Sequence, residues 1–114
     1  MNWIELTELN QLTTVKQTSF NKPVVLFKHS TRCGTSSMVL SRLNRAATPA
    51  MPVDFYFLDL IKHRDISNQI AQDFNEYHQS PQLLLIINGE CTYAESHLGI
   101  TMDELMEQLL TPGI

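Results

Sequence analysis

Cys33 has the most evident potential for chemistry in this 114-residue sequence, because it lies where a strand pattern gives way to a helical one. The apolar run 24–27 predicts a buried strand, and a helical pattern begins at about Thr35. Unpaired backbone N–H groups and the positive end of the helix dipole meet at such a junction and stabilise a thiolate. Arg32 adds a neighbouring positive charge. Because thiolates attack disulfides, we predict that Cys33 is a redox-active nucleophile.

Ser36 stands where the second thiol of a Cys-x-x-Cys motif would be, with Gly34 and Thr35 between it and Cys33. These neighbours predict a site with one thiol, in which the Ser36 hydroxyl can donate a hydrogen bond to the thiolate. A small buried cysteine in a helix cap is the alternative interpretation, since cysteine is among the residues most often buried and inert. That structural role needs neither the strand nor the arginine, so the redox interpretation is favoured.

Cys91 follows Asn88-Gly89, a pair typical of a tight β-hairpin turn. The turn places Cys91 at the end of the sheet away from Cys33, and a strand of about six residues spans about 20 Å. A disulfide requires Cα atoms within roughly 7 Å of each other. We therefore expect Cys91 to be structural and not a resolving thiol.

The four histidines form no metal-binding motif, because none lies at metal-ligand spacing from another histidine or a cysteine. No metal site is expected. His97 returns along the last strand toward the Cys33 end and is a candidate substrate contact. His29, four residues before Cys33 on an extended segment, is interpreted as a packing or polar residue.

Composition favours a single globular domain over residues 1–114, with 43% hydrophobic and 18% charged residues. The net charge is −4 and no basic patch is present, so nucleic-acid binding is not expected. The longest apolar run, 83–87, is far too short to span a bilayer, so no membrane partner is expected. The first residues lack the pattern of a secretory signal, which favours a cytoplasmic location with both cysteines free.

The apolar pattern predicts strands alternating with helices, ending in a hairpin and a last helix. Thr7 is the expected N-cap of the first helix, Tyr77 closes the apolar face of the third, and Thr101 with Glu104 forms a capping box for the fourth. The predicted strands are 3–6, 24–28, 53–60, 83–87 and 90–95, and the apolar face of the last helix comprises Met102, Leu105, Met106, Leu109 and Leu110. This order predicts an α/β fold with a mixed central sheet and helices on both faces.

Two features together resemble the thioredoxin fold: Cys33 at a strand-to-helix turn, and Ser80-Pro81 directly before a strand and an Asn-Gly hairpin. The resemblance implies a three-layer α/β/α arrangement in which Pro81 is cis and lies against the thiol. On the residues alone, a trans proline opening a strand is the ordinary outcome.

Four segments narrow this resemblance further: Phe27-Lys28-His29-Ser30-Thr31-Arg32-Cys33, Ser80-Pro81-Gln82, Ser96-His97 and Gly99-Ile100-Thr101. Together they resemble the monothiol bacilliredoxin-like (YtxJ-type) family, over about residues 3–110. The resemblance implies a small redox protein that works with bacillithiol, a low-molecular-weight thiol co-substrate, with no bound cofactor. Cys33 would take bacillithiol from S-thiolated client proteins, and Ser80, Pro81 and the backbone edge at Gln82 would contact substrate. By similarity to glutaredoxins, Lys28 would bind a substrate carboxylate.

The thiol partner stays open at this point. Cys33-Gly34-Thr35-Ser36 departs from a Cys-Pro form of the motif and resembles the Cys-Gly-x-Ser of monothiol glutaredoxins. That pattern allows three alternatives: a glutathione-dependent protein, an iron–sulfur-binding module, or a non-catalytic regulator of the thioredoxin fold.

Overall fold

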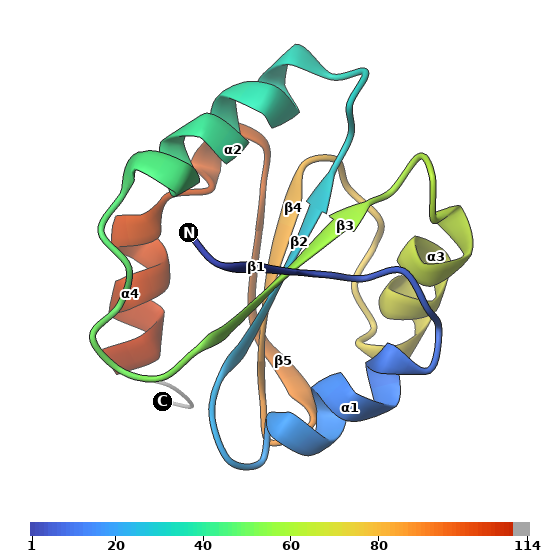
Figure 1. Ribbon diagram of the computed structural model, residues 1–114, viewed down its shortest axis with the longest axis vertical. Coiled ribbons are helices and arrows are strands. Elements are labelled where there is room, and N and C mark those ends of the chain that lie inside the picture. The colour runs from blue at the N-terminus through green and yellow to red at the C-terminus, as the bar shows by residue number, and fades with distance from the viewer. Residues whose placement is uncertain (111–114) are drawn as a thin grey trace.

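The computed structural model describes residues 1–110, which form a β-sheet between two layers of helices (Figure 1). In Figure 1, α2 and α4 cover one face of the sheet, and α1 and α3 cover the other. The elements in chain order are β1 (Trp3–Glu5), α1 (Gln11–Thr18), β2 (Val24–His29), α2 (Gly34–Arg45), β3 (Asp54–Asp59), α3 (Arg64–Asp73), β4 (Gln82–Ile87), β5 (Glu90–Ser96), the short 3₁₀ helix η1 (His97–Gly99) and α4 (Met102–Leu110).

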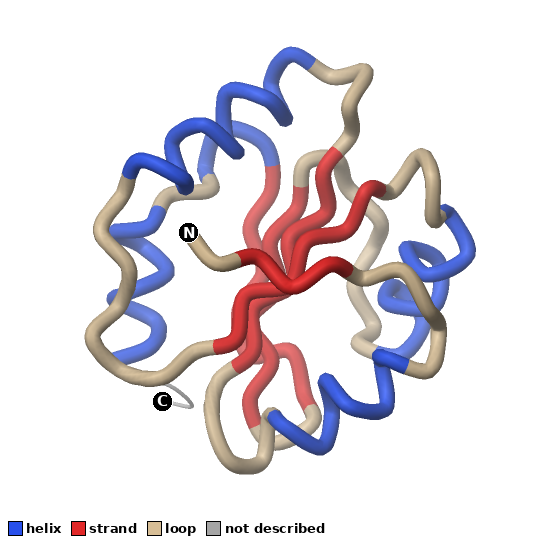
Figure 2. The backbone as a smooth tube through the Cα atoms, viewed as in Figure 1, coloured by secondary structure: helices blue, strands red, loops and turns tan. Residues whose placement is uncertain are grey.

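The five strands of the described chain form one mixed sheet, as predicted, and their spatial order is β1-β3-β2-β4-β5 (Figure 2). β1, β3 and β2 run parallel, while β4 and β5 are antiparallel to their neighbours. All six residues of β2 are buried, because this strand has a strand on each side and helices over both faces. Residues that follow the end of β2 therefore emerge from the centre of the sheet.

Successive side chains of β2 enter two separate cores, as the two-residue period of a strand requires. Val24 and Leu26 pack in the core under α1 and α3. Val25 and Phe27 pack in the core under α2 and α4. The same alternation sends Lys28 and His29, at the end of the strand, toward opposite helix layers.

The predicted hairpin is present, with Asn88 and Gly89 both at positive φ (54° and 79°). Positive φ at both central residues is what a tight hairpin turn requires, and glycine and asparagine tolerate it. The turn is also fastened to the end of α1, because the Asn88 and Gly89 N–H groups donate to the Ser19 backbone oxygen and Oγ.

Three details of the helix predictions are wrong. Thr7 does not cap α1, which begins at Gln11; the Gln11 side chain instead reaches back to accept the Thr7 and Glu8 N–H groups. Tyr77 lies beyond the end of α3 and is 92% exposed, because Asn75 takes a left-handed conformation that ends the helical path. Leu110, at the end of α4, is also exposed.

One of the two hydrogen bonds of the predicted capping box is present at the N-terminus of α4. The Thr101 hydroxyl oxygen accepts the Glu104 N–H at 3.2 Å, which is the N-cap bond of a capping box. Within residues 1–110, no helix combines the length and the apolar character needed to cross a membrane.

Candidate functional site

Cys33 is the N-cap residue of α2, four residues beyond the end of β2. Its backbone is extended (φ −113°, ψ 118°); its N–H donates to the Ser30 carbonyl, and its carbonyl accepts the Ser37 N–H. The residue is partly exposed and its thiol is free. The structure thus places Cys33 at the predicted junction, within reach of an external reactant.

The beginning of α2 suits an anion on Cys33. No side chain caps this helix, so the N–H groups of its first turn retain capacity for an acceptor. An N-cap side chain typically accepts from the second or third helical residue, here Thr35 or Ser36, and a thiolate can fill that role. The Arg32 side chain is exposed, so solvent weakens its effect on the sulfur.

Ser36, one helical turn after Cys33, is fully buried and hydrogen-bonded within the protein. Its Oγ accepts the Ser30 N–H at 3.0 Å and lies 2.7 Å from His29 Nδ1. The sequence predicted that this hydroxyl would donate to the thiolate, whereas the structure pairs it with an imidazole. The pairing joins residues seven apart through the fold, and no spacing in the sequence signals it.

His29 itself is only 6% exposed and packs against the rings of Phe27 and Phe57, which also contact each other. Burial lowers the pKa of His29 below its ordinary value, because the charged imidazolium loses hydration, and the carboxylate of Asp59 opposes this effect. The ring is therefore a buried, mainly neutral partner for Ser36.

The segment that leads into β4 lies at the same end of the sheet as Cys33. The Ser80-Pro81 bond is cis, which confirms the prediction made from the fold resemblance. Gln82 pairs with Lys28 of β2, so Pro81 flanks the end of that strand. The Pro81 carbonyl accepts the His97 N–H at 3.0 Å. Ser80, Pro81 and His97 are thus brought to the Cys33 end.

Gln82 does not offer the open edge expected of it. Its backbone lies inside the sheet, between Lys28 on one side and Ser96 on the other. Its side chain is buried and holds the preceding loop: Nε2 donates to the Tyr77 carbonyl, and Oε1 accepts the Gln79 N–H. Gln82 therefore shapes the approach to Pro81 from within the protein.

Lys28 is not brought to the Cys33 face. Its side chain is fully buried on the α3 side of the sheet, where Nζ donates to the Ser67 carbonyl at 3.0 Å and lies 3.4 Å from His78 Nδ1. Burial lowers the Lys28 pKa to about 8. The expected contact with a substrate carboxylate is unsupported, because this ammonium is occupied inside the protein. The unbroken apolar run before Lys28 is the signal that could have indicated its burial.

Arg42 is a contributor that the sequence did not reveal. Its guanidinium Nη2 donates to the carbonyls of Leu98 and Ile100, and so ties the turn after β5 to α2. The bond to Leu98 measures 3.0 Å. This contact holds the His97 segment against the helix that begins at Cys33.

Cys91 lies at the other end of the sheet, as predicted. It pairs with Ile86, which in turn pairs with Val24 at the start of β2. Cys91 is free, and its Sγ donates a weak hydrogen bond to the Tyr93 carbonyl. Burial, followed by the nearby Glu76 carboxylate, raises the pKa of the Cys91 thiol to about 12.

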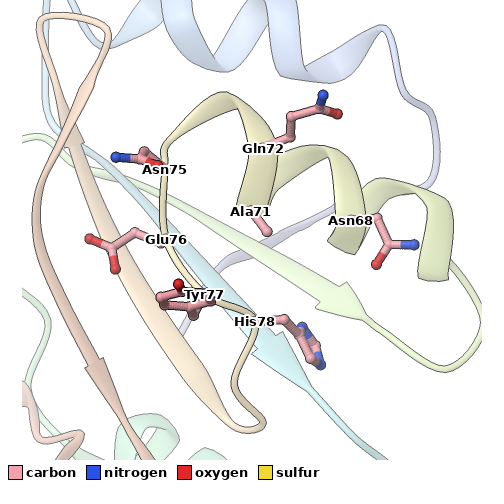
Figure 3. A pocket seen from close by; sticks show the side chains of 7 residues that line it. All are labelled: Asn68, Ala71, Gln72, Asn75, Glu76, Tyr77 and His78. Carbon is pink, nitrogen blue, oxygen red and sulfur yellow. The ribbon is translucent and has the colours of Figure 1, made fainter.

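A cavity of about 600 Å³ lies beside α3 and the loop that follows it (Figure 3). No lining residue comes from the turn between β2 and α2, so this cavity is separate from the Cys33 site. In residues 1–110, no group of three or more His, Cys, Asp or Glu side chains is arranged to hold a metal ion. The cavity is lined by Asn68, Ala71, Gln72, Asn75, Glu76, Tyr77 and His78.

Comparison with solved structures shows the class of protein that this fold and site define. A chain described as a proposed oxidoreductase with a thioredoxin fold is 30% identical, with a TM-score of 0.77, covering 91% of this chain and 90% of that one. The Malassezia sympodialis thioredoxin Mala s 13 is 23% identical (TM-score 0.71; 96% and 89% covered). Thioredoxin f2 of Chlamydomonas reinhardtii is 16% identical (TM-score 0.72; 99% and 100% covered) and, like the Malassezia protein, shows the fold alone.

The protein is therefore a thioredoxin-fold protein with a thiol redox role. The model of the family described as monothiol bacilliredoxin BrxC matches residues 4–105, and the chain belongs to that family.

Proposed function

We propose that the protein removes bacillithiol from mixed disulfides on client proteins, with Cys33 as the nucleophile. The Cys33 thiolate attacks the bacillithiol sulfur, so that a Cys33–bacillithiol disulfide forms while the client leaves as a thiolate and takes a proton from water. A second bacillithiol thiolate then attacks the bound bacillithiol sulfur. Bacillithiol disulfide leaves, and the Cys33 thiolate is regenerated.

The observation that carries this proposal is the isolation of Cys33 from any other thiol among the described residues. Ser36 occupies the place of a second thiol in the same helical turn, and it is bonded to His29. Cys91 pairs with Ile86 at the far end of β4. Because neither side chain can resolve a mixed disulfide on Cys33, the cycle must be completed by an external thiol. A small thiol is the simplest reactant for that step.

The family description supports the choice of bacillithiol, and the accessible N-cap position of Cys33 supports its role in attack. We place the cycle in the cytoplasm, where low-molecular-weight thiols keep cysteines reduced. Ser80, Pro81 and His97 lie at the Cys33 end and are the proposed contacts for the mixed disulfide. Client proteins carrying an exposed mixed disulfide are the proposed partners.

The test is a direct comparison of two small thiols. A peptide carrying one cysteine is prepared as its bacillithiol and its glutathione mixed disulfide, and release of the peptide thiol is timed with intact-mass analysis of the protein. We expect wild type and Cys91→Ser to acquire a single bacillithiol adduct, and Cys33→Ser to acquire none. Faster transfer from the glutathione peptide would replace bacillithiol with glutathione in the proposal. An adduct on Cys91 would contradict the one-thiol cycle.

A further inference from the structure

The Ser36 hydroxyl is the only side-chain group shown to link the Cys33 turn to a buried titratable residue within residues 1–110. Ser36 is the third residue of α2, and Cys33 is the N-cap. Residues three apart on a helix lie on the same face, so Ser36 is one helical turn from Cys33 on the same face of α2. The Ser36 hydroxyl lies 2.7 Å from the Nδ1 atom of His29, and the structure shows no hydrogen bond between it and the Cys33 sulfur.

The hydrogen-bonding capacity of this hydroxyl is limited. A serine Oγ has one proton to donate and two lone pairs that accept. The Ser30 N–H occupies one lone pair, at 3.0 Å. One proton and one lone pair remain, to be divided between His29 Nδ1 and the Cys33 sulfur. If the hydroxyl donates to Nδ1, it can only accept from the thiol; if Nδ1–H donates to Oγ, the hydroxyl proton turns to the sulfur.

We propose that His29 is a positioning residue for Cys33 chemistry that exchanges a proton with the thiol through Ser36. In one state the Cys33 S–H donates to Ser36 Oγ, whose own proton lies on the bond to Nδ1. In the other state the thiol proton has passed to Ser36, the Ser36 proton has passed to Nδ1, and an imidazolium faces a thiolate. No other reactant is needed. The inference rests on the proposed role of Cys33 as nucleophile.

The surroundings of His29 favour a coupled response. Phe27 and Phe57 pack against the ring with centroids 6.2 and 5.4 Å away, and the 6% exposure of His29 leaves little access for water. Asp59, at the end of β3, is the charged group that acts on the ring, and its carboxylate favours the imidazolium. Because electrostatic interactions are stronger where water is excluded, a thiolate formed one turn away adds to the effect of Asp59. Hydrogen bonds of this kind are commonly long before a reactant binds and tighten in the complex.

The first experiment measures the rate of Cys33 alkylation by iodoacetamide from pH 5 to 10, in a Cys91→Ala parent. Hydrogen bonds to charged groups are strong enough that His29→Leu and Ser36→Ala should each slow alkylation at pH 7 roughly tenfold. The double variant should be no slower than Ser36→Ala alone, because His29 acts through that hydroxyl. His29→Asn, whose amide can donate to Oγ, should retain the fast rate but lose the pH step that His29 contributes.

The second experiment follows the His29 ring by NMR as pH is varied. In the reduced protein its titration midpoint should be higher than after Cys33 has been carbamidomethylated, and Ser36→Ala should remove that difference. His63→Asn is the matched control, because it removes a histidine that caps α3 and has no side-chain bond to Ser36. It should leave the alkylation profile unchanged. Urea unfolding of every variant separates loss of fold from loss of coupling.

Several results would overturn the proposal: faster alkylation in His29→Leu, equal effects of His29→Leu with and without Ser36, or a His29 midpoint indifferent to modification of Cys33. Alkylation needs no biological disulfide, so the two proposals can fail separately. If His29 and Cys33 are coupled but no bacillithiol is transferred from the peptide, only the proposed function is refuted. Bacillithiol transfer with an uncoupled His29 would refute only the inference.

Discussion

Cys33 and Cys91 lie at opposite ends of the same sheet and are both partly exposed, but the groups around them differ. Cys33 follows the central strand β2 and is the N-cap residue of α2. Cys91 lies beside the hairpin turn, packs against the core under α1 and α3, and faces the Glu76 carboxylate. One end supplies N–H groups that favour a thiolate, and the other supplies apolar surface and a negative charge that oppose it.

The comparison predicts that the reactivity of each cysteine depends on the end of the sheet at which it lies. Parallel strands β2 and β3 end at the same edge, and the antiparallel strand β4 begins there. The Cys33 loop, Pro81 and His97 therefore lie together at one end of the strands. The hairpin that carries Cys91 closes the opposite edge and is fastened to Ser19. Four measurements test this difference between the two ends of the sheet.

The largest effect is expected from removing each thiol in turn. Cys33→Ser should abolish formation of the small-thiol adduct and release of client thiol, since no other described thiol lies at that edge. Cys91→Ser should retain both activities within about twofold, because a substitution far from Cys33 does not alter the exchange step. Intact-mass analysis and a timed peptide assay measure the two outcomes. A Cys33–Cys91 disulfide after mild oxidation would contradict the separation of the two ends.

The next effect concerns reactivity of the two thiols in the folded protein. Burial and Glu76 raise the pKa of Cys91 to about 12, so very little thiolate forms there at pH 8. We expect iodoacetamide to modify Cys91 roughly 100-fold more slowly than Cys33, since the thiolate is the reacting species. Peptide mapping after timed alkylation gives both rates, and unfolding in urea should equalise them. Comparable rates in the folded protein would show that burial does not protect Cys91.

The third effect concerns Lys28, at the end of β2, and tests whether burial of its side chain lowers its own pKa. Its pKa is lowered to about 8 from an ordinary 10.5. Below pH 8 both folded and unfolded chains hold the proton, so the full cost of burying the charge is present. Between pH 8 and 10.5 only the unfolded chain holds it, so stability rises with pH. Lys28→Met should raise the free energy of unfolding by roughly 3 kcal/mol at pH 7, and the gain should vanish near pH 10.5.

Urea unfolding of both proteins across this range provides the measurement. The pKa values of Cys91 and Tyr93 are raised to about 12, so these groups lower the free energy of unfolding at high pH. They do so equally in both proteins, and their contribution cancels in the difference. A difference that does not change with pH would mean that the Lys28 ammonium is better stabilised than its burial implies. A loss of stability at pH 7 would mean that its bond to Ser67 outweighs the cost of burying the charge.

The smallest effect isolates the charge beside Cys91. Glu76→Gln removes the second cause of its raised pKa and leaves burial, the first cause, in place. We expect alkylation of Cys91 at pH 9 to become about threefold faster, because one carboxylate near a partly screened site contributes modestly. Glu90→Gln is the matched control, since Glu90 adjoins Cys91 in sequence but is not among the charges that act on it. If both variants speed the alkylation of Cys91 equally, the cause is the net charge of the protein and not the carboxylate of Glu76.

Much of the fold could be predicted from the chain alone because its signals are local. The apolar run before Lys28, the Asn88-Gly89 pair and the Thr101 N-cap of α4 each depend on neighbouring residues, and each appears where expected. The errors lie at element ends: a side chain from inside α1, Gln11, displaced Thr7 as a cap, and Asn75 ended α3 before Tyr77. Such ends are decided by competition between alternatives of nearly equal free energy.

The order of residues along the chain is enough to place Cys33 at a helix N-terminus after a strand, with Ser36 in the place of a second thiol. It is also enough to place Cys91 at the other end of the sheet, after a strand and a turn. The partners of the buried polar groups follow from the packing of the folded protein: Ser36 with His29 on one face, and Lys28 with Ser67 and His78 on the other. The physical reason is that strand alternation separates neighbouring side chains onto two faces, while packing of distant helices selects the partner that each one meets.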